Sequence, residues 1–396
     1  MKRMKKELLF IVIALFILPM ALVIIWPAQS EAKELKIAVI TALSGAGAEW
    51  GRGVLHGAEL ASDEVNSKGG VKIGGEKYTI KLVAYDDKYT GAGGAAAAHK
   101  AVYEDKVKFI IGSISSASVL AFQDVTEKNK ILVLANSWAR DVLKPEKPYS
   151  FRMFMSSTQL APGLAQMVHK LYPNIQTAVT VAPNDASGWS VAEDYVKGYE
   201  AIGIKVISKE FPERGTKDYY PMLNRIKAMN PGLIQDGALG VGAVAILTKQ
   251  IRELGIKALP VGGATIDPDL LVKICGKKEA EDFTYPSVFN INSDKPIVVN
   301  FLKNFKKKYG EKATITYVDP SFYDAANLLF AAMEKANSTD STKVRDSLET
   351  IREFEGVNGK LEFGGKETYG IDHQLYQSYY IAQIKDGRET ILGWVR

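Results

Sequence analysis

Apolar, strand-like runs alternate with helix-like segments along nearly all of the chain after residue 34. The first pair is typical. The run LKIAVITAL (35–43) precedes a segment, residues 50–70, with apolar residues on one helical face and two glycines at its end. Strands that alternate with helices of this length form right-handed βαβ units and a parallel sheet with helices on both faces. The pattern therefore predicts an α/β fold.

The alternation is interrupted by a proline-bearing stretch, KPEKPYSFRMFMSS (144–157), and then starts again. Because 396 residues are also more than one core usually holds, we predict two lobes of similar plan. Lobes of this kind bind ligands outside the carboxyl ends of their strands. The predicted strands of the two halves are residues 35–43, 78–87, 107–113 and 130–136, and then 177–183, 205–211, 232–237 and 258–263.

The first 32 residues have the pattern of a secretory signal peptide. A basic stretch, Met1–Lys6, precedes the apolar segment Leu8–Trp26, and small residues follow at Ser30 and Ala32. We predict cleavage after Ala32 and a soluble product in the periplasm. The alternative is an uncleaved membrane anchor, since about 19 apolar residues approach the length that spans a bilayer. Pro19 interrupts the run and favours the signal peptide.

Charge and cysteine content exclude several classes of function. The net charge of +5 would fall to +3 after removal of residues 1–32, which is too little to predict a nucleic-acid partner. Cys275 is the one cysteine, so no internal disulfide can form. The four histidines are scattered, without the spacing of metal ligands. We expect neither a metal nor a cofactor.

The segment FIIGSISSAS (109–118) is a strand-like run that ends at Gly112 and is followed by serines. A nucleophile, a phosphate site and a pocket for a small ligand are all compatible with it. The chain has no Gly-x-Ser-x-Gly elbow and no phosphate loop. The segment GAGGAA (91–96) formally fits a dinucleotide fingerprint, but three residues separate it from its strand, which favours a plain helix start. What remains is a serine turn whose backbone N–H groups suit an anionic oxygen, or serines that only cap the helix.

Residues 36–71, KIAVITALSGAGAEWGRGVLHGAELASDEVNSKGGV, resemble the start of the type I periplasmic binding proteins of the branched-chain amino acid transport group. YDDKYT, FIIGSISSAS and ILVLANSW follow in the family's order, and the resemblance covers essentially the whole mature chain. It implies two Rossmann-like lobes with parallel sheets, joined by three hinge strands near residues 154, 285 and 366. The expected segments are 1–32 for the signal peptide, 33–154 and 286–365 for lobe 1, and 155–285 and 366–396 for lobe 2.

The resemblance also implies a set of ligand-binding residues. Ser116 would receive a ligand carboxylate, with Ser115 beside it. Ser137 and Ala139 would hold the ligand mainly through backbone atoms, and Trp50 would cover it from the first lobe.

Two positions depart from the family's pattern. Ser187 stands where the second lobe usually has an aromatic residue. Ala264 stands where amino-acid binders have an acidic residue that pairs with the ligand ammonium. A buried ammonium without a counter-charge is costly, so its partner must come from elsewhere, and Asp236 and Asp267 are the candidates.

We therefore predict a monomeric solute-binding protein of an ABC importer, not an enzyme. It would capture a small carboxylate-bearing solute, a branched-chain or related apolar amino acid, by hinge closure, and deliver it to an inner-membrane ABC permease. The alternative is a receptor for an aromatic or aliphatic carboxylic acid, or an amide, without an ammonium. An exported hydrolase is a further alternative, but it would need a general base near a nucleophile, and no such pair is visible in the sequence.

Overall fold

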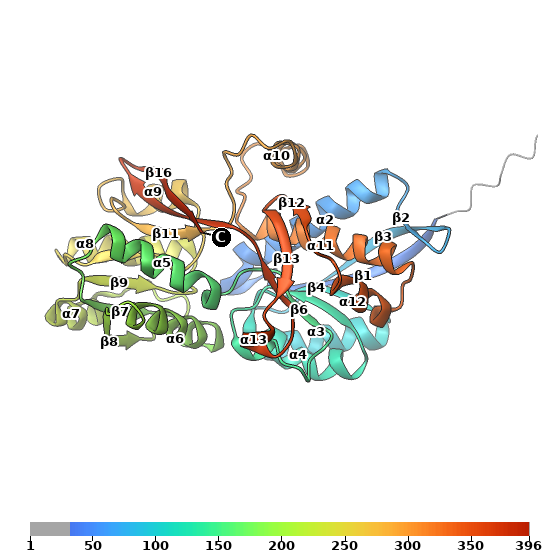
Figure 1. The fold of residues 1–396 in the computed structure, drawn as a ribbon, viewed down its shortest axis with the longest axis horizontal. Coiled ribbons are helices and arrows are strands. Elements are labelled where there is room, and N and C mark those ends of the chain that lie inside the picture. The colour runs from blue at the N-terminus through green and yellow to red at the C-terminus, as the bar shows by residue number, and fades with distance from the viewer. Residues whose placement is uncertain (1–31, 396) are drawn as a thin grey trace, which may run out of the picture.

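The computed structural model describes residues 32–395, which form two α/β lobes arranged along the long axis of the molecule (Figure 1). Each lobe has its own sheet, of nine strands in the first and seven in the second. The predicted fold class is thereby confirmed. The predicted signal peptide lies outside the described residues, apart from Ala32.

The first sheet is mainly parallel. Its strands are β1 (Lys33–Thr41), β2 (Val71–Ile73), β3 (Glu76–Asp86), β4 (Phe109–Gly112), β5 (Leu132–Ala135), β6 (Ser150–Arg152), β12 (Phe354–Gly356), β13 (Gly359–Gly364) and β14 (Gln374–Tyr376). They lie in the order β12-β13-β14-β6-β5-β4-β1-β3-β2. The strands from β14 to β3 are parallel, while β2, β12 and β13 add antiparallel pairs at the two edges. All four residues of β4 and of β5 are buried, as expected of central strands in a sheet covered on both faces.

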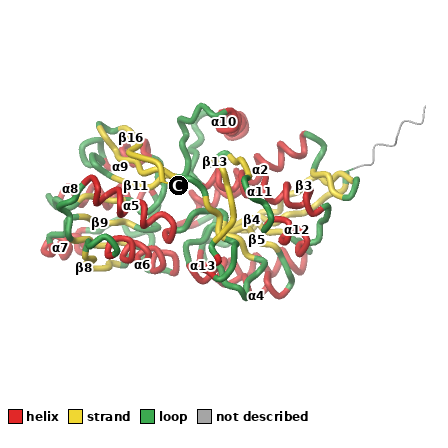
Figure 2. Tube along the Cα trace, viewed as in Figure 1, coloured by secondary structure: helices red, strands yellow, loops and turns green. Residues whose placement is uncertain are grey.

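Helices cover both faces of this sheet (Figure 2). One face packs against α2 (Ala48–Ser67), α10 (Pro296–Tyr309), α11 (Val318–Ala336) and α12 (Ser341–Leu348). The other packs against α3 (Gly91–His99) and α4 (Ser116–Lys128). Thr90 caps α3, and a Cβ on Gly94 would lie 2.2 Å from Ser118 Oγ of α4. The glycines of GAGGAA therefore permit close helix packing, as the plain helix start predicted.

The second lobe repeats this plan. Its strands are β7 (Thr177–Val181), β8 (Lys205–Glu210), β9 (Leu233–Asp236), β10 (Leu259–Val261), β11 (Thr284–Ser287), β15 (Tyr379–Lys385) and β16 (Arg388–Val395), in the order β16-β15-β11-β10-β9-β7-β8. Helices α5 (Ser157–Leu171) and α6 (Ala186–Glu200) cover one face. Helices α7 (Tyr220–Met229), α8 (Val241–Glu253) and α9 (Pro268–Cys275) cover the other. No helix within residues 32–395 is long and apolar enough to cross a membrane.

The chain passes between the lobes three times: between β6 and α5, between β11 and α10, and between β14 and β15. The third passage corrects the expected boundary at residue 366. The short helix α13 (Lys366–Tyr369) leads into β14, which pairs with β6 and β13 of the first sheet. The chain therefore enters the second lobe only after Tyr376. Elements of three or four residues have too little periodicity to reveal to which sheet they belong.

Candidate functional site

The serine turn follows β4 at the carboxyl edge of the first sheet. Gly112 has a φ of +102°, and a Cβ there would lie 2.1 Å from the carbonyl oxygen of Ile40, so the turn requires glycine. Ser115 is the N-cap of α4, and its hydroxyl accepts a hydrogen bond from the Ser118 N–H at 3.3 Å. For Ser115, the interpretation as a helix cap is therefore correct.

Ser116 is the centre of a buried polar cluster. Its Oγ accepts the Ala139 N–H at 3.0 Å and lies 2.9 Å from the Ser137 hydroxyl. The Ser187 hydroxyl of the second lobe also contacts it, at 2.8 Å. The structure thus brings together Ser115, Ser116, Ser137, Ala139 and Ser187, all of them buried. In this closed arrangement the second lobe itself occupies the hydrogen-bonding capacity of Ser116.

A cavity of about 620 Å³ lies beside this cluster, between the two lobes. Ile114, Asn136 and Trp138, the sequence neighbours of the clustered residues, form part of its wall. Of the predicted ligand-binding residues, Trp50 and Ala264 line the cavity. Much of the remaining wall is apolar or aromatic: Tyr89, Ala238, Leu239, Val241, Ile266, Phe289, Ile291, Ile315 and Tyr317. The carboxyl ends of strands from both lobes meet here, as the parallel-sheet rule predicts.

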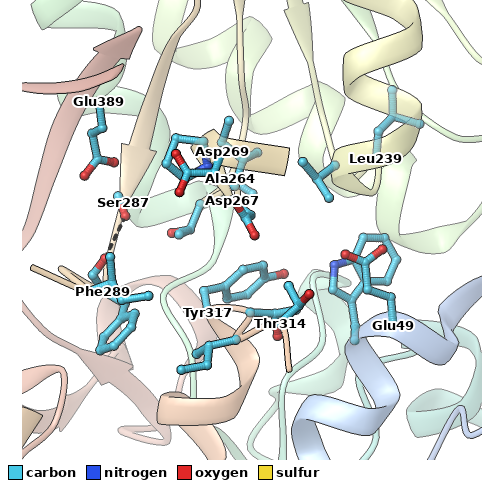
Figure 3. A pocket seen from close by; sticks show the side chains of 18 of the residues that line it. Glu49, Leu239, Ala264, Asp267, Asp269, Ser287, Phe289, Thr314, Tyr317 and Glu389 are labelled. Atoms are coloured by element: carbon cyan, nitrogen blue, oxygen red, sulfur yellow. Dashed lines mark hydrogen bonds between the residues drawn. The ribbon is translucent and has the colours of Figure 1, made fainter. Parts of the chain in front are cut away.

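Carboxylates enter this cavity from both lobes (Figure 3). Glu49 belongs to α2 of the first lobe, while Asp267 and Asp269 belong to the start of α9 in the second. Burial raises the pKa of Glu49; the field of Arg52 opposes this shift, and the field of Asp267 adds to it. Burial also raises the pKa of Asp267, with a contribution from the field of Asp269. A cation bound between Glu49 and Asp267 would lower the pKa of both carboxyl groups.

The remaining charged residues of the wall are Glu389, Glu311, Lys312 and Arg388. Burial raises the pKa of Glu389, which accepts a hydrogen bond from the Tyr380 hydroxyl at 3.3 Å. Acidic residues therefore outnumber basic ones in the cavity wall. No cluster of three potential metal ligands occurs within residues 32–395.

The two candidate ammonium partners have different positions. Asp267 faces the cavity and also caps α9, accepting the Leu270 N–H at 2.9 Å. Asp236, at the end of β9, is buried in the second lobe and is not part of the described cavity wall. Burial raises the pKa of Asp236 to about 8, so this carboxyl is mainly neutral at pH 7. Ala264 brings no charge to the wall.

Ion pairs and ring contacts join the lobes around the serine cluster. Arg140, which follows β5, forms an ion pair with Asp194 of α6. Asp194 also accepts hydrogen bonds from the hydroxyls of Ser157 at 2.5 Å and Thr158 at 2.9 Å. All of these partners lie at the boundary between the lobes, so opening of the cleft must break the pair.

Another cation at the boundary is Arg214, which belongs to the second lobe and contacts residues of the first. Its guanidinium lies 4.8 Å from the centre of the Tyr89 ring and 5.9 Å from that of Trp50. Its Nε donates to Asp185 at 2.7 Å. The residues of the second lobe thus supply both ends of this ion pair, and the first lobe supplies the aromatic faces.

Sequence reasoning did not assign Glu49, Asp269, Tyr89 or Tyr317 to the ligand. Glu49 precedes Trp50 in the first turn of a helix, where an acidic residue usually only interacts with the helix dipole. The loop tyrosines had no periodic signal. The available signal for Glu49 was its neighbour Trp50, which the resemblance already assigned to the ligand.

Two α/β lobes, joined by three passages of the chain around a cavity that both lobes line, define a bilobed receptor for a small molecule. The periplasmic binding protein family matches residues 34–389, so the chain belongs to that family, in its type I branched-chain amino acid group. The prediction from residues 36–71 and the motifs that follow is confirmed. The family consists of solute-binding proteins, which agrees with the prediction of a binding protein rather than an enzyme.

Individual relatives agree with this assignment. The Leu/Ile/Val-binding protein BraC3 of Rhizobium johnstonii is 27% identical over 350 residues, which cover 87% of this chain and 91% of the relative. A leucine-binding protein from Thermotoga maritima superposes with a TM-score of 0.78 at 22% identity, covering 91% of this chain and 98% of that one. A solute-binding protein from R. palustris in complex with 4-hydroxybenzoate superposes with a TM-score of 0.79 at 19% identity, covering 92% and 97%.

Proposed function

We propose that this protein is the extracytoplasmic receptor of an ABC importer and that it captures an apolar amino acid by closure of its two lobes. The ligand would enter the open cleft and contact both lobes, which stabilises the closed state over the open one. A membrane permease of the importer would then receive it. Export by the signal peptide in residues 1–32 is part of the same proposal.

The observation that carries the choice of ligand is the distribution of charge along the cleft. Two first-lobe arginines, Arg140 and Arg152, lie next to the serine cluster, while Glu49 and Asp267 lie in the cavity beside it. Aromatic residues line the space around these carboxylates. An amino acid matches this arrangement because it joins a carboxylate, an ammonium and an apolar side chain. The carboxylate would replace the Ser187 hydroxyl at Ser116, and Asp267 with Glu49 would receive the ammonium.

The size of the cavity allows side chains larger than that of leucine. The volume of about 620 Å³ lies within the usual range of small-molecule pockets, about 300–1,000 Å³. Aromatic amino acids therefore belong to the proposed class together with branched-chain ones.

The second candidate is an aromatic or aliphatic carboxylic acid without an ammonium. Ala264 favours it, because this position has no acidic side chain, and so does the aromatic wall around Trp50 and Trp138. The relative from R. palustris that was solved with 4-hydroxybenzoate has the same fold. In this case the carboxylates of the cavity would have to be protonated or solvated in the complex.

Matched sets of three ligands distinguish these candidates. Leucine, 4-methylpentanoate and 3-methylbutylamine share one side chain, and phenylalanine, 3-phenylpropanoate and 2-phenylethylamine share another. Melting temperature and tryptophan fluorescence would be followed with each ligand. We expect the amino acids to raise the melting temperature most, because only they occupy both ends of the cleft. A larger rise with the deamino acids would favour the second candidate, and no response to any of the six would contradict both.

A further inference from the structure

Arg152 is a fully buried cation whose bonded partners are neutral. It is the last residue of β6, with an exposed fraction of 0%. Its Nη1 donates to the side-chain oxygen of Gln374 at 2.8 Å, and its Nη2 donates to the carbonyl oxygen of Ala139 at 2.6 Å. Its guanidinium also lies 5.0 Å from the centre of the Tyr369 ring. Among residues 32–395, no hydrogen-bond acceptor is found for its Nε.

A buried guanidinium without a bonded carboxylate is costly, because it loses its hydration and gains no opposite charge in return. Burial lowers the pKa of Arg152, but an arginine side chain stays charged in proteins. The hydroxyl of Tyr369 opposes this decrease in pKa most, and the carboxylate whose field acts on Arg152 is Asp194 of the second lobe, which is already paired with Arg140. Two arginines thus share one carboxylate at this end of the cleft, which leaves positive charge in excess.

Ala139 connects this charge to the serine turn. Its carbonyl oxygen accepts from Arg152, and its N–H donates to the Oγ of Ser116 at 3.0 Å. The guanidinium therefore lies directly behind the backbone that forms the wall of the polar cluster. In an interior of low dielectric constant, a charge at this place acts strongly on any group that Ser116 binds.

The position of Arg152 is fixed by two of the passages between the lobes. The side-chain amide of Gln374, its partner, donates to the carbonyl oxygens of Phe154 at 2.7 Å and Leu375 at 2.8 Å. Phe154 belongs to the first passage, and Gln374 and Leu375 belong to β14, just before the third. These bonds hold the charge in the first lobe, so it remains behind the serine turn when the second lobe moves away.

We propose that the positive charge of Arg152 determines the specificity of the serine turn. Because of this charge, the turn binds a carboxylate in preference to an uncharged amide of the same shape. This inference rests on the proposed function, because it takes the ligand carboxylate to bind at Ser116. Arg152 does not touch the ligand. It acts as a positioning residue through Ala139, and the ligand carboxylate supplies the negative charge that Arg152 lacks.

The test compares each carboxylate with its amide in Arg152→Gln and Arg152→Lys. The probe pairs are leucine with leucinamide, and 4-hydroxybenzoate with 4-hydroxybenzamide, and dissociation constants would be measured by calorimetry. In the wild type we expect the carboxylate of the bound pair to be preferred. Arg152→Gln should weaken carboxylate binding by about tenfold or more, equivalent to about 1.4 kcal/mol, and should change amide binding less than about threefold. Arg152→Lys should retain most of the preference because it retains the charge.

The possible results separate this inference from the proposed function. If the wild type binds none of the four probes, phenylalanine and phenylalaninamide take their place; a wild type that binds neither of these would contradict the proposed function and this inference with it. A wild type that binds a carboxylate, together with an Arg152→Gln variant of unchanged preference, would overturn only the role of Arg152. Equal weakening of carboxylate and amide would show a merely structural role. If Arg152→Gln does not fold, Arg152→Lys decides: loss of its preference would assign selectivity to the guanidinium geometry and overturn the role of the charge.

Discussion

The buried carboxyl of Asp236 should make the stability of the protein depend on pH. Asp236 is 5% exposed, and its Oδ2 has no hydrogen-bond partner within the described part of the chain. Burial raises its pKa to about 8 in the folded protein, whereas in the unfolded chain it should be about 3.9. The unfolded state therefore releases this proton at a lower pH. The free energy of unfolding should fall as pH rises from about 4 to about 8 and should be unaffected by this group outside that window.

The magnitude follows from the difference in pKa. About four pKa units at about 1.4 kcal/mol each give a total loss of about 5.5 kcal/mol above pH 8, most of which is already present at pH 7. Asp236→Asn removes the titrating group. Its amide nitrogen would be buried without an acceptor, at a cost of about 1–3 kcal/mol that does not depend on pH. The variant should therefore be less stable than the wild type near pH 4 and more stable near pH 9.

Thermal unfolding from pH 4 to pH 9 would test this reasoning, with the expected result that the two melting-temperature profiles cross. Asp319→Asn is the matched control. Asp319 is equally buried, but it accepts the Thr316 N–H at 2.8 Å and the Thr316 hydroxyl at 2.7 Å, and it pairs with His56 at 3.0 Å. An amide cannot replace both acceptors, so this variant should melt earlier at every pH. Parallel profiles for the wild type and Asp236→Asn would refute the reasoning.

Two further predictions concern the cleft. Asp267→Asn should weaken binding of an amino acid by about tenfold and leave binding of the matching deamino acid unaffected. Asp269→Asn should have a smaller effect, because Asp269 is more exposed. Equal dissociation constants for Asp267→Asn and the wild type would contradict the assignment of Asp267 to the ligand ammonium. Ser187→Ala removes the contact of 2.8 Å with Ser116 and so destabilises the closed state by about 1 kcal/mol. Small-angle scattering of the ligand-free protein should therefore show a more open average conformation. A scattering curve identical to that of the wild type would exclude a role of Ser187 in closure.

The sequence predicted the fold well because its elements are long and periodic. The run at 35–43 corresponds to β1, and the helical segment at 50–70 corresponds to α2 within three residues at each end. The predicted position of the third passage between the lobes was wrong. This position depends on the pairing of Gln374 in β14 with Arg152 in β6, and these residues are far apart in the chain. No local pattern carries that information.

The candidate site was predictable only in part. Ser115, Ser116, Ser137 and Ala139 follow neighbouring parallel strands, so their proximity follows from the fold class. The position of Asp236 did not follow, because all four residues of β9 are buried and alternation gives no contrast between the two faces.

The route of the chain also has a consequence for folding order. Strands β15 and β16 complete the second sheet beside β11, although the rest of that sheet is formed from residues before 288. Neither lobe can therefore fold completely early in synthesis, which starts at the amino end. The first sheet is complete only when β12 to β14 are present, and the second only when the final hairpin is present. Nearly the whole polypeptide must be present before either core closes, which favours late, cooperative folding over lobe-by-lobe folding. If the chain is exported before it folds, as the proposed function requires, such a delay would be an advantage.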